Sequence, residues 1–155
     1  MSDETNQFAG ECYCGKVTVT VSGSPVVQGY CHCRSCRKWH AAPVNAWSLW
    51  RSRDVVIVGE TRTATLGGRS NRISCTACGG GFANSFPSRN ALVVYPMTLA
   101  DSEFNFAPQF HIHYSERVLD FSDGLPKFSV WHQNEDGTSG ELISDTGTTG
   151  WCVKA

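Results

Sequence analysis

The chain has 155 residues, a formal net charge of −1 at pH 7 and 17% charged residues, which is typical of a globular protein long enough to bury a core. The near-neutral charge argues against bulk electrostatic binding to nucleic acid or to a membrane surface, and we predict neither as a partner. Apolar runs such as residues 55–58 are too short to span a bilayer. The polar, acidic first residues carry no secretory signal, so we expect a cytoplasmic, reducing location.

The elements predicted along the chain are mostly strands. Residues 16–21 alternate, with Val17, Val19 and Val21 on one face. A short helix is predicted from Arg34 to about His40, ending before a proline. Further strands are predicted over residues 44–50, 55–58, 61–66, 92–95 and 104–114, with a helical turn around 99–103.

No linker or internal repeat divides the sequence. We therefore predict one domain over residues 1–155, with its core at about residues 10–130. From residue 133 onward the chain is polar and rich in Gly, Thr, Ser and Asp. We expect residues 133–155 to form a terminal hairpin or a loose tail.

The eight cysteines are the strongest functional signal, because seven of them fall into three tight groups. An even number of cysteines permits a disulfide framework, but disulfides are rare in the cytosol and a chain of this length does not need them. Closely spaced pairs followed by glycine favour a metal, and zinc in particular. The groups are Cys12-x-Cys14-Gly15, Cys31-His32-Cys33-x-x-Cys36 and Cys75-x-x-Cys78-Gly79.

The first and third groups each resemble a zinc knuckle. Gly15 and Gly79 suit the tight turn that lets two thiolates reach one ion. Together the two knuckles complete a closed, structural S4 site with Cys12, Cys14, Cys75 and Cys78 as ligands. The alternative is that the first knuckle is an ordinary surface turn and that only the second binds metal.

The middle group places Cys31, Cys33 and Cys36 on one short loop and helix start, which suits one ion with an open fourth position. A thiol bound there loses its proton at neutral pH and can attack an aldehyde. There are three alternatives to this interpretation. The fourth ligand could be Cys152, it could be His32 or His40, or one of the three cysteines could be a packed bystander.

Several residues near these groups are candidates for substrate binding. Arg34, Arg37 and Lys38 follow the middle cysteines and could bind the carboxylates of a peptide thiol, or could simply form a solvated helix face. His111 and His113 would share one face of a strand and could line the pocket, or could be exposed on an edge.

These motifs resemble the glutathione-dependent formaldehyde-activating enzyme family, which includes the centromere-protein-V-like proteins. The likeness covers roughly residues 10–130. It includes Gly-x-Cys-x-Cys-Gly at residues 10–15, Cys-His-Cys-x-x-Cys-Arg at 31–37 and Cys-x-x-Cys-Gly at 75–79, then His-Ile at 111–112 and Asp-Gly-Leu-Pro-x-Phe at 123–128. One departure is that many members carry a tryptophan between the last two motifs, where residues 114–121 have none.

The resemblance implies a β-tent fold of several short curved antiparallel sheets stabilised by zinc. It also implies two Zn²⁺ per chain: a structural ion on Cys12, Cys14, Cys75 and Cys78, and a catalytic ion on Cys31, Cys33 and Cys36. The implied activity is that of a carbon–sulfur lyase acting on thiol–aldehyde adducts, glutathione plus formaldehyde giving S-hydroxymethylglutathione, or a related thiol.

The alternative function is a non-catalytic, zinc-stabilised thiol carrier or protein-interaction module. The expected partner of the enzyme or carrier is a small thiol such as glutathione, and that of the interaction module is a protein surface. The chain is expected to be a monomer or a homodimer.

Overall fold

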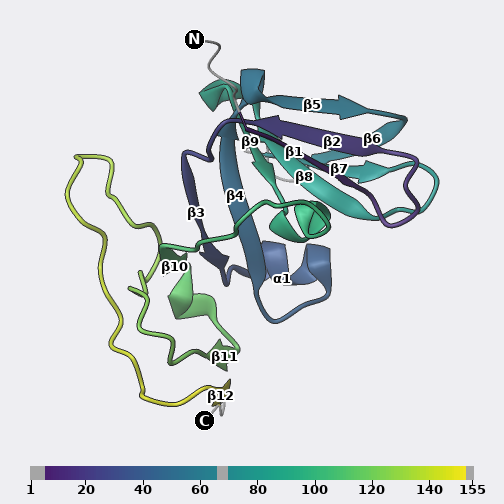
Figure 1. Ribbon diagram of the computed structural model, residues 1–155. Helices are drawn as coiled ribbons and strands as arrows, with labels where there is room; N and C mark the ends of the chain where they lie inside the picture. Colours follow the sequence, from purple (N-terminus) through teal and green to yellow (C-terminus); the bar gives the residue numbers. More distant parts are fainter. Residues whose placement is uncertain (1–5, 66–69, 153–155) are drawn as a thin grey trace. The chain divides into compact units, whose positions relative to one another are not determined.

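The computed structural model describes residues 6–65 and 70–152, and the chain forms two compact units that are each built from two segments. The first unit takes residues 1–27 and 47–106, and the second takes 28–46 and 107–155. Strands dominate the first unit, whereas the second has short strands, a short α-helix and long irregular segments (Figure 1). The expectation of a mostly β fold with several sheets is therefore confirmed, whereas the single domain stays a prediction. Within the described residues, no helix is long and apolar enough to cross a membrane.

The first unit holds antiparallel strands in two sets. One is a sheet in the order β1-β2-β5, made of β1 (Gln7–Glu11), β2 (Thr18–Ser22) and β5 (Val55–Val58). In the other set, neighbours pair in the order β4-β9-β8-β7-β6. Its strands are β4 (Asn45–Arg51), β9 (Ala91–Val94), β8 (Gly81–Phe86), β7 (Asn71–Cys75) and β6 (Thr61–Thr65). The 3-10 helices η1 (Ser52–Asp54), η2 (Pro87–Arg89) and η3 (Pro96–Leu99) lie between strands.

The core of this unit joins the two sets of strands. Val17, Val19 and Val21 are fully buried, as their alternation predicts, and they cluster with Trp50 and with apolar side chains of β8 and β9. Cys12 and Cys75 belong to the same buried cluster. The first metal-binding candidates are therefore part of the hydrophobic core.

The second unit is built around the middle cysteines. Strand β3 (Val27–Cys31) leads into helix α1 (Arg34–His40), and β10 (Phe110–Ile112) pairs with β3 in parallel. The 3-10 helix η4 (Tyr114–Glu116) follows β10. Strand β11 (Leu119–Asp120) then pairs antiparallel with β12 (Gly150–Trp151), which holds the chain's last described residues against this unit.

The predicted elements are largely confirmed, with one clear error. The helix at Arg34–His40 is correct, and the turn expected around residues 99–103 is present, because Ser102 N–H donates to the Leu99 carbonyl at 3.0 Å. The strand predicted over residues 104–114 is wrong outside Phe110–Ile112. His113 ends it with a φ of 53°, which is incompatible with a strand. Leu66, the end of the strand predicted over 61–66, lies outside the described residues.

Gly10 provides a test of how closely β1 packs against η3. A Cβ at this position would lie 2.0 Å from the Thr98 carbonyl oxygen, so an added methyl group must push the backbone apart. We expect Gly10→Ala to lower the free energy of unfolding by about 3 kcal/mol, the upper range for overpacking, measured by urea denaturation of the metal-loaded protein. Gly150→Ala is the matched control, since no heavy atom lies within 4 Å of its Cβ. Equal stability of the two variants would contradict this packing.

Candidate metal centres

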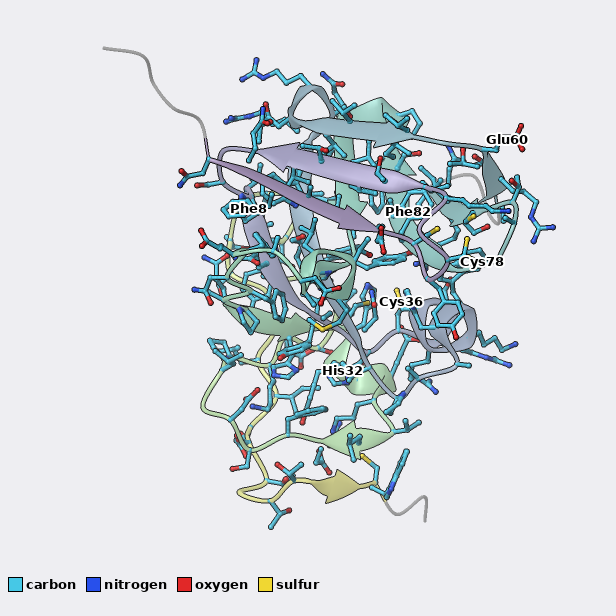
Figure 2. All side chains as sticks on the ribbon, turned by 45° about the vertical axis from the view of Figure 1, so that its right-hand side comes forward. Phe8, His32, Cys36, Glu60, Cys78 and Phe82 are labelled. Atoms are coloured by element: carbon cyan, nitrogen blue, oxygen red, sulfur yellow. The ribbon has the colours of Figure 1, made fainter. Side chains whose placement is uncertain are left out.

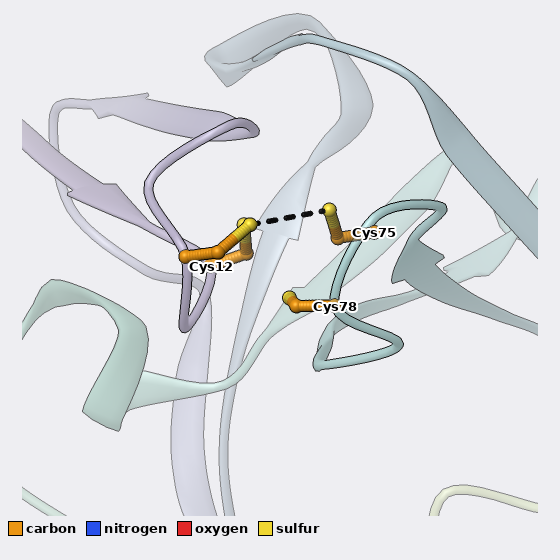
Figure 3. Close-up of side chains that lie close together, drawn as sticks. Cys12, Cys75 and Cys78 are labelled. Carbon is orange, nitrogen blue, oxygen red and sulfur yellow. Dashed lines mark hydrogen bonds between the residues drawn. The ribbon is translucent and has the colours of Figure 1, made fainter.

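Four cysteines of the first unit gather into one group. The sulfurs of Cys12, Cys14, Cys75 and Cys78 all lie within 4.8 Å of one another. Cys12 and Cys14 come from the turn after β1, and Cys75 and Cys78 from the turn between β7 and β8. The two segments face each other across the group (Figure 3). The structure therefore brings together the closed set that the knuckle motifs predict.

The two turns that present these sulfurs have the same hydrogen-bond pattern. Gly15 N–H donates to the Cys12 carbonyl and Gly79 N–H to the Cys75 carbonyl, both at 2.9 Å. The glycines have φ values of 75° and 73°, a conformation that glycine adopts without strain. Backbone N–H groups also point at sulfur, with Val17 donating to Cys12 Sγ at 3.3 Å and Gly80 to Cys78 Sγ at 3.4 Å. Such donors stabilise thiolates.

The spacing of these sulfurs fits a tetrahedral metal site. Metal–sulfur bonds of about 2.3 Å place tetrahedral ligands about 3.8 Å apart. The Cys12 and Cys14 sulfurs are 3.7 Å apart, and those of Cys14 and Cys75 are 3.9 Å apart. Burial opposes ionisation of Cys12, but hydrogen bonds from Val17 N–H and neighbouring groups lower the pKa of its thiol to about 6. The donor set therefore suits a thiolate-binding ion such as Zn²⁺.

The second group lies in the other unit, where β3 ends and α1 begins. The sulfurs of Cys31, Cys33 and Cys36 lie within 4.8 Å of one another. Cys33 is the N-cap of α1, and its sulfur accepts the Cys36 N–H at 3.3 Å. Cys31 and Cys36 are buried and Cys33 is half-buried. Figure 2 labels one cysteine of each group, Cys36 and Cys78.

The three thiols of the second group share protons unequally. Hydrogen bonds from the Cys31 and Cys36 thiols, together with the Cys36 N–H, lower the pKa of the Cys33 thiol. The same sharing with Cys33 and Cys36, together with burial, raises the pKa of Cys31. Cys33 is therefore the first thiolate of the group, and an ion with three sulfur ligands would complete the deprotonation of the other two.

Among the described residues, no fourth side chain joins this group. His32 and His40 contribute no ligand atom to it, although one lies between two of the cysteines and the other ends α1. Cys152 lies after β12, where its thiol contacts Asp120 Oδ2 at 3.4 Å. Burial and the Asp120 carboxylate raise the pKa of that thiol. The eighth cysteine is therefore engaged elsewhere, and all eight are free thiols.

The predicted substrate-binding residues fall into two kinds of environment. Arg34 and Lys38 are exposed on α1. Arg37 is half-buried and donates from Nε to the His32 carbonyl at 3.0 Å and from Nη2 to the Glu116 carbonyl at 3.1 Å. His111 is fully buried, and both of its ring nitrogens have partners, His32 and Asp123. Arg34, Arg37 and Lys38 can therefore contact a ligand. His111 makes its hydrogen bonds inside the protein.

A shallow cavity of about 330 Å³ lies beside α1. Its polar lining comes from Arg37 and Lys38, and the exposed ring of Trp151 forms part of its wall. Small apolar residues complete the surface: Ala41, Ala42, Pro43 and Val118. The cavity suits a small, partly anionic molecule, and it adjoins the helix that carries Cys36.

The sequence indicates His113 as a candidate beside the second group but gives no sign of its partner, Glu116. Glu116 accepts the Arg34 N–H at 2.8 Å through Oε2, and its Oε1 lies 3.3 Å from His113 Nδ1. His113 lies close enough to the Cys33 thiol to lower its pKa whenever the imidazole carries a positive charge, an effect smaller than the hydrogen bonds described above. Its φ of 53° is strained for a residue other than glycine. Only spatial proximity identifies this pair, because Glu116 belongs to no motif.

The fold and the two cysteine groups define a mostly β protein with two candidate metal centres of different completeness. The profile of the family described as glutathione-dependent formaldehyde-activating enzyme matches residues 7–116. The chain belongs to this family.

A solved structure of a Rhodobacter sphaeroides protein is similar in fold. Its sequence identity to this chain is 20%, with a TM-score of 0.50, and the match covers 60% of this chain and 88% of the other. No curated protein matches the chain.

We expect Cys75→Ser to remove one metal ion per chain and to leave the protein insoluble. A structural thiolate–zinc site supplies on the order of 10 kcal/mol of folding free energy, and Cys75 is both a ligand candidate and a core residue. Metal content by mass spectrometry and recovery in the soluble fraction measure the effect. Cys152→Ser is the control and should keep its full metal content. A soluble Cys75→Ser protein with unchanged metal content would refute the assignment.

Proposed function

We propose that this protein is a zinc-dependent carbon–sulfur lyase acting on thiol–aldehyde adducts, with glutathione and formaldehyde, or a related thiol, in equilibrium with the S-hydroxymethyl adduct. The family match supports glutathione-dependent formaldehyde activation. The observation that carries the proposal is the group of three sulfurs that no fourth side chain joins among the described residues. A three-ligand site keeps one position for substrate, whereas a four-ligand site does not.

In this proposal the two cysteine groups have different roles. Cys12, Cys14, Cys75 and Cys78 would hold a structural Zn²⁺, and Cys31, Cys33 and Cys36 a catalytic one. A catalytic zinc ion supplies a binding place at which a thiol ionises at neutral pH. The β-tent arrangement, the cytoplasmic location and a monomeric or homodimeric state remain part of the proposal.

The reaction needs a proton carrier, and the structure offers His113 for this role. As the carbon–sulfur bond forms, the thiol gives up its proton, the carbonyl π bond breaks and the oxygen gains a proton, with no change of oxidation state. Glu116, as a carboxylate, can only accept a hydrogen bond, so it favours the proton on His113 Nδ1 and leaves Nε2 as an acceptor. His113 Nε2 would take the thiol proton and return it to the new hydroxyl group.

The cavity beside α1 would receive the anionic part of a peptide thiol. Lys38 is exposed there and no protein carboxylate is paired with it among the described ion pairs. Arg34 lies one turn earlier on the same helix. Arg37 is committed to the backbone at two of its nitrogens, so it would chiefly hold this surface in place.

The direct test follows the glutathione–formaldehyde equilibrium by NMR exchange spectroscopy. We expect the metal-loaded protein to accelerate exchange, and Cys36→Ser to abolish the acceleration and to lose one of two metal ions while the closed site keeps the first unit folded. Cys152→Ser should match the unmodified protein. If two ions bind without acceleration but glutathione still binds, the protein is a thiol carrier. If glutathione does not bind either, the interaction module replaces the enzyme.

A second prediction separates chemistry from binding. His113→Gln should lower kcat about a hundredfold with KM for the thiol unchanged, the usual size of a general acid–base contribution. Lys38→Ala should raise KM about two- to fivefold with kcat unchanged, as expected for one solvent-exposed charge contact.

Steady-state kinetics at several thiol concentrations measure both constants, and each variant is the control for the other. Lys16→Ala, a change of the same type at an exposed lysine outside the cavity, should alter neither constant. If both His113→Gln and Lys38→Ala change kcat and KM together, these roles are wrong.

A further inference from the structure

A chain of hydrogen bonds, buried at the histidine pair, runs from the middle cysteine segment to two partly exposed carboxylates. His32 Nε2 lies 2.8 Å from His111 Nδ1, and His111 Nε2 lies 2.8 Å from Asp123 Oδ2. Lys127 Nζ continues the chain, at 3.0 Å from Asp123 Oδ1 and 3.1 Å from Asp145 Oδ2. The side chains of His32, His111 and Lys127 are almost completely buried. The metal chemistry described above uses none of them.

The Asp123 carboxylate, which lies between His111 and Lys127, determines which ring nitrogen of each histidine carries the proton. Burial opposes ionisation of Asp123, but hydrogen bonds from His111 and Lys127 lower its pKa to about 2, so it is an acceptor. Burial lowers the pKa of His111, which favours the neutral form of its ring, and the tautomer of that form follows from the hydrogen bonds. His111 must carry its proton on Nε2, facing Asp123, and accept at Nδ1. His32 must then donate from Nε2, which leaves Nδ1 of His32 without a proton.

Aromatic rings pack around the two histidines of this chain. The Tyr30 ring stacks on His111 at a centroid distance of 5.0 Å, and the Tyr114 ring meets His32 edge-on at 4.8 Å. Phe121 packs against both histidines, at 5.6 Å and 5.3 Å. Hydrogen bonds in such an apolar, water-poor environment are stronger, and breaking one is more costly, than at the surface. The tautomer of His32 is therefore strongly determined.

His32 is also held at its backbone, directly between two candidate ligands. Its N–H donates to the Ile112 carbonyl at 3.1 Å, and its carbonyl accepts from Arg37 Nε at 3.0 Å. With the ring bond to His111, three hydrogen bonds fix the residue that separates Cys31 from Cys33. An ion held by three protein ligands has one protein ligand fewer than an ion in a closed, four-ligand site. Its geometry depends more on the residues that support the ligands.

We propose that His111 and Asp123 are positioning residues for the Cys31–Cys33–Cys36 centre, acting through a single tautomer of His32. They hold the segment between Cys31 and Cys33 in the geometry that binds metal and leaves the fourth position for substrate. This role rests on the proposed function, because it requires these cysteines to hold an ion. It reassigns His111 from substrate contact to support of the centre.

Lys127 provides an internal control, because it is bound to two carboxylates and only one of them reaches His111. Asp123→Asn keeps the size of the side chain and removes the charge, so the amide can donate to His111 Nε2 and reverse both tautomers. Asp145→Asn makes the same change on the other side of Lys127, at a carboxylate that makes no hydrogen bond to His111 and acts on it only through its charge. Asp123→Glu restores a carboxylate and should restore the original tautomers.

The experiment measures two quantities on the full-length protein. Zinc affinity of the second centre is obtained by competition with a chromophoric chelator, and the ring tautomers of His32 and His111 by ¹⁵N-resolved NMR. We expect Asp123→Asn to weaken zinc binding at this centre about 10- to 100-fold, the usual effect of removing a residue that supports a ligand, and to move the ring protons. Asp145→Asn should change neither quantity, and Asp123→Glu should stay within a few-fold of the unmodified protein.

Several results would overturn the inference. They are equal losses of affinity in Asp123→Asn and Asp145→Asn, no rescue by Asp123→Glu, or reversed tautomers with unchanged affinity. The opposite His32 tautomer in the unmodified protein would also overturn it, whether or not the variants fold. If the unmodified protein binds only one ion per chain, with Cys12, Cys14, Cys75 and Cys78 as its ligands, the proposed function fails instead. The two failures are thereby distinguished.

Discussion

The first unit depends on four sulfur atoms that join two distant parts of the chain. Cys14 and Cys75 are 61 positions apart in sequence, yet their sulfurs are 3.9 Å apart. An ion bound by this group would tie the turn after β1 to the turn between β7 and β8 inside the hydrophobic core. A structural zinc site contributes on the order of 10 kcal/mol, which is comparable to the whole stability of a typical domain, about 5–15 kcal/mol. The packing of β1, β2, β7 and β8 would therefore be coupled to metal binding.

The two cysteine groups are supported by different hydrogen bonds. In the closed group each knuckle supplies its own support, since backbone N–H groups of Val17 and Gly80 donate to the sulfurs of Cys12 and Cys78. Four thiolates around Zn²⁺ carry a net charge of −2, which such donors offset locally. The second group has three sulfurs and a net charge of −1 by the same count. Within it the Cys36 N–H donates to Cys33 Sγ at 3.3 Å, and further support comes through the chain of hydrogen bonds that starts at His32.

Much of this architecture could be predicted from local pattern. Val17, Val19 and Val21 alternate and are buried, the helix at Arg34–His40 has its expected limits, and the cysteine groups form as their spacing indicates. These features depend on residues a few positions apart. The strand predicted over residues 104–114 forms only at Phe110–Ile112. It ends there because His113 takes a left-handed conformation, which nothing in its alternating neighbours signals.

The functional pairs could not be predicted, because they join segments with no fixed spacing. His32 meets His111 across 79 positions, and Arg34 meets Glu116 across 82. Considered alone, His32 is a histidine between two candidate ligands and Glu116 is a surface carboxylate, so neither residue indicates a functional role. The parallel pairing of β10 with β3 explains both contacts, since it places Ile112 opposite Cys31 and so brings residues 111–116 beside the cysteine segment. One strand pairing therefore determines which side chains surround the centre.

Whether the second group would keep an open position likewise depends on which side chains lie near it in space. Cys152 is the cysteine that could have closed it, and composition alone cannot decide whether it does. The pairing of β11 with β12 places Cys152 beside Asp120, and the Cys152 N–H donates to the Val118 carbonyl at 2.9 Å. Asp120 is in turn paired with Arg117 at 2.5 Å. A carboxylate neighbour disfavours the thiolate that metal binding requires, so the environment that holds Cys152 away from the centre also makes it a poor ligand.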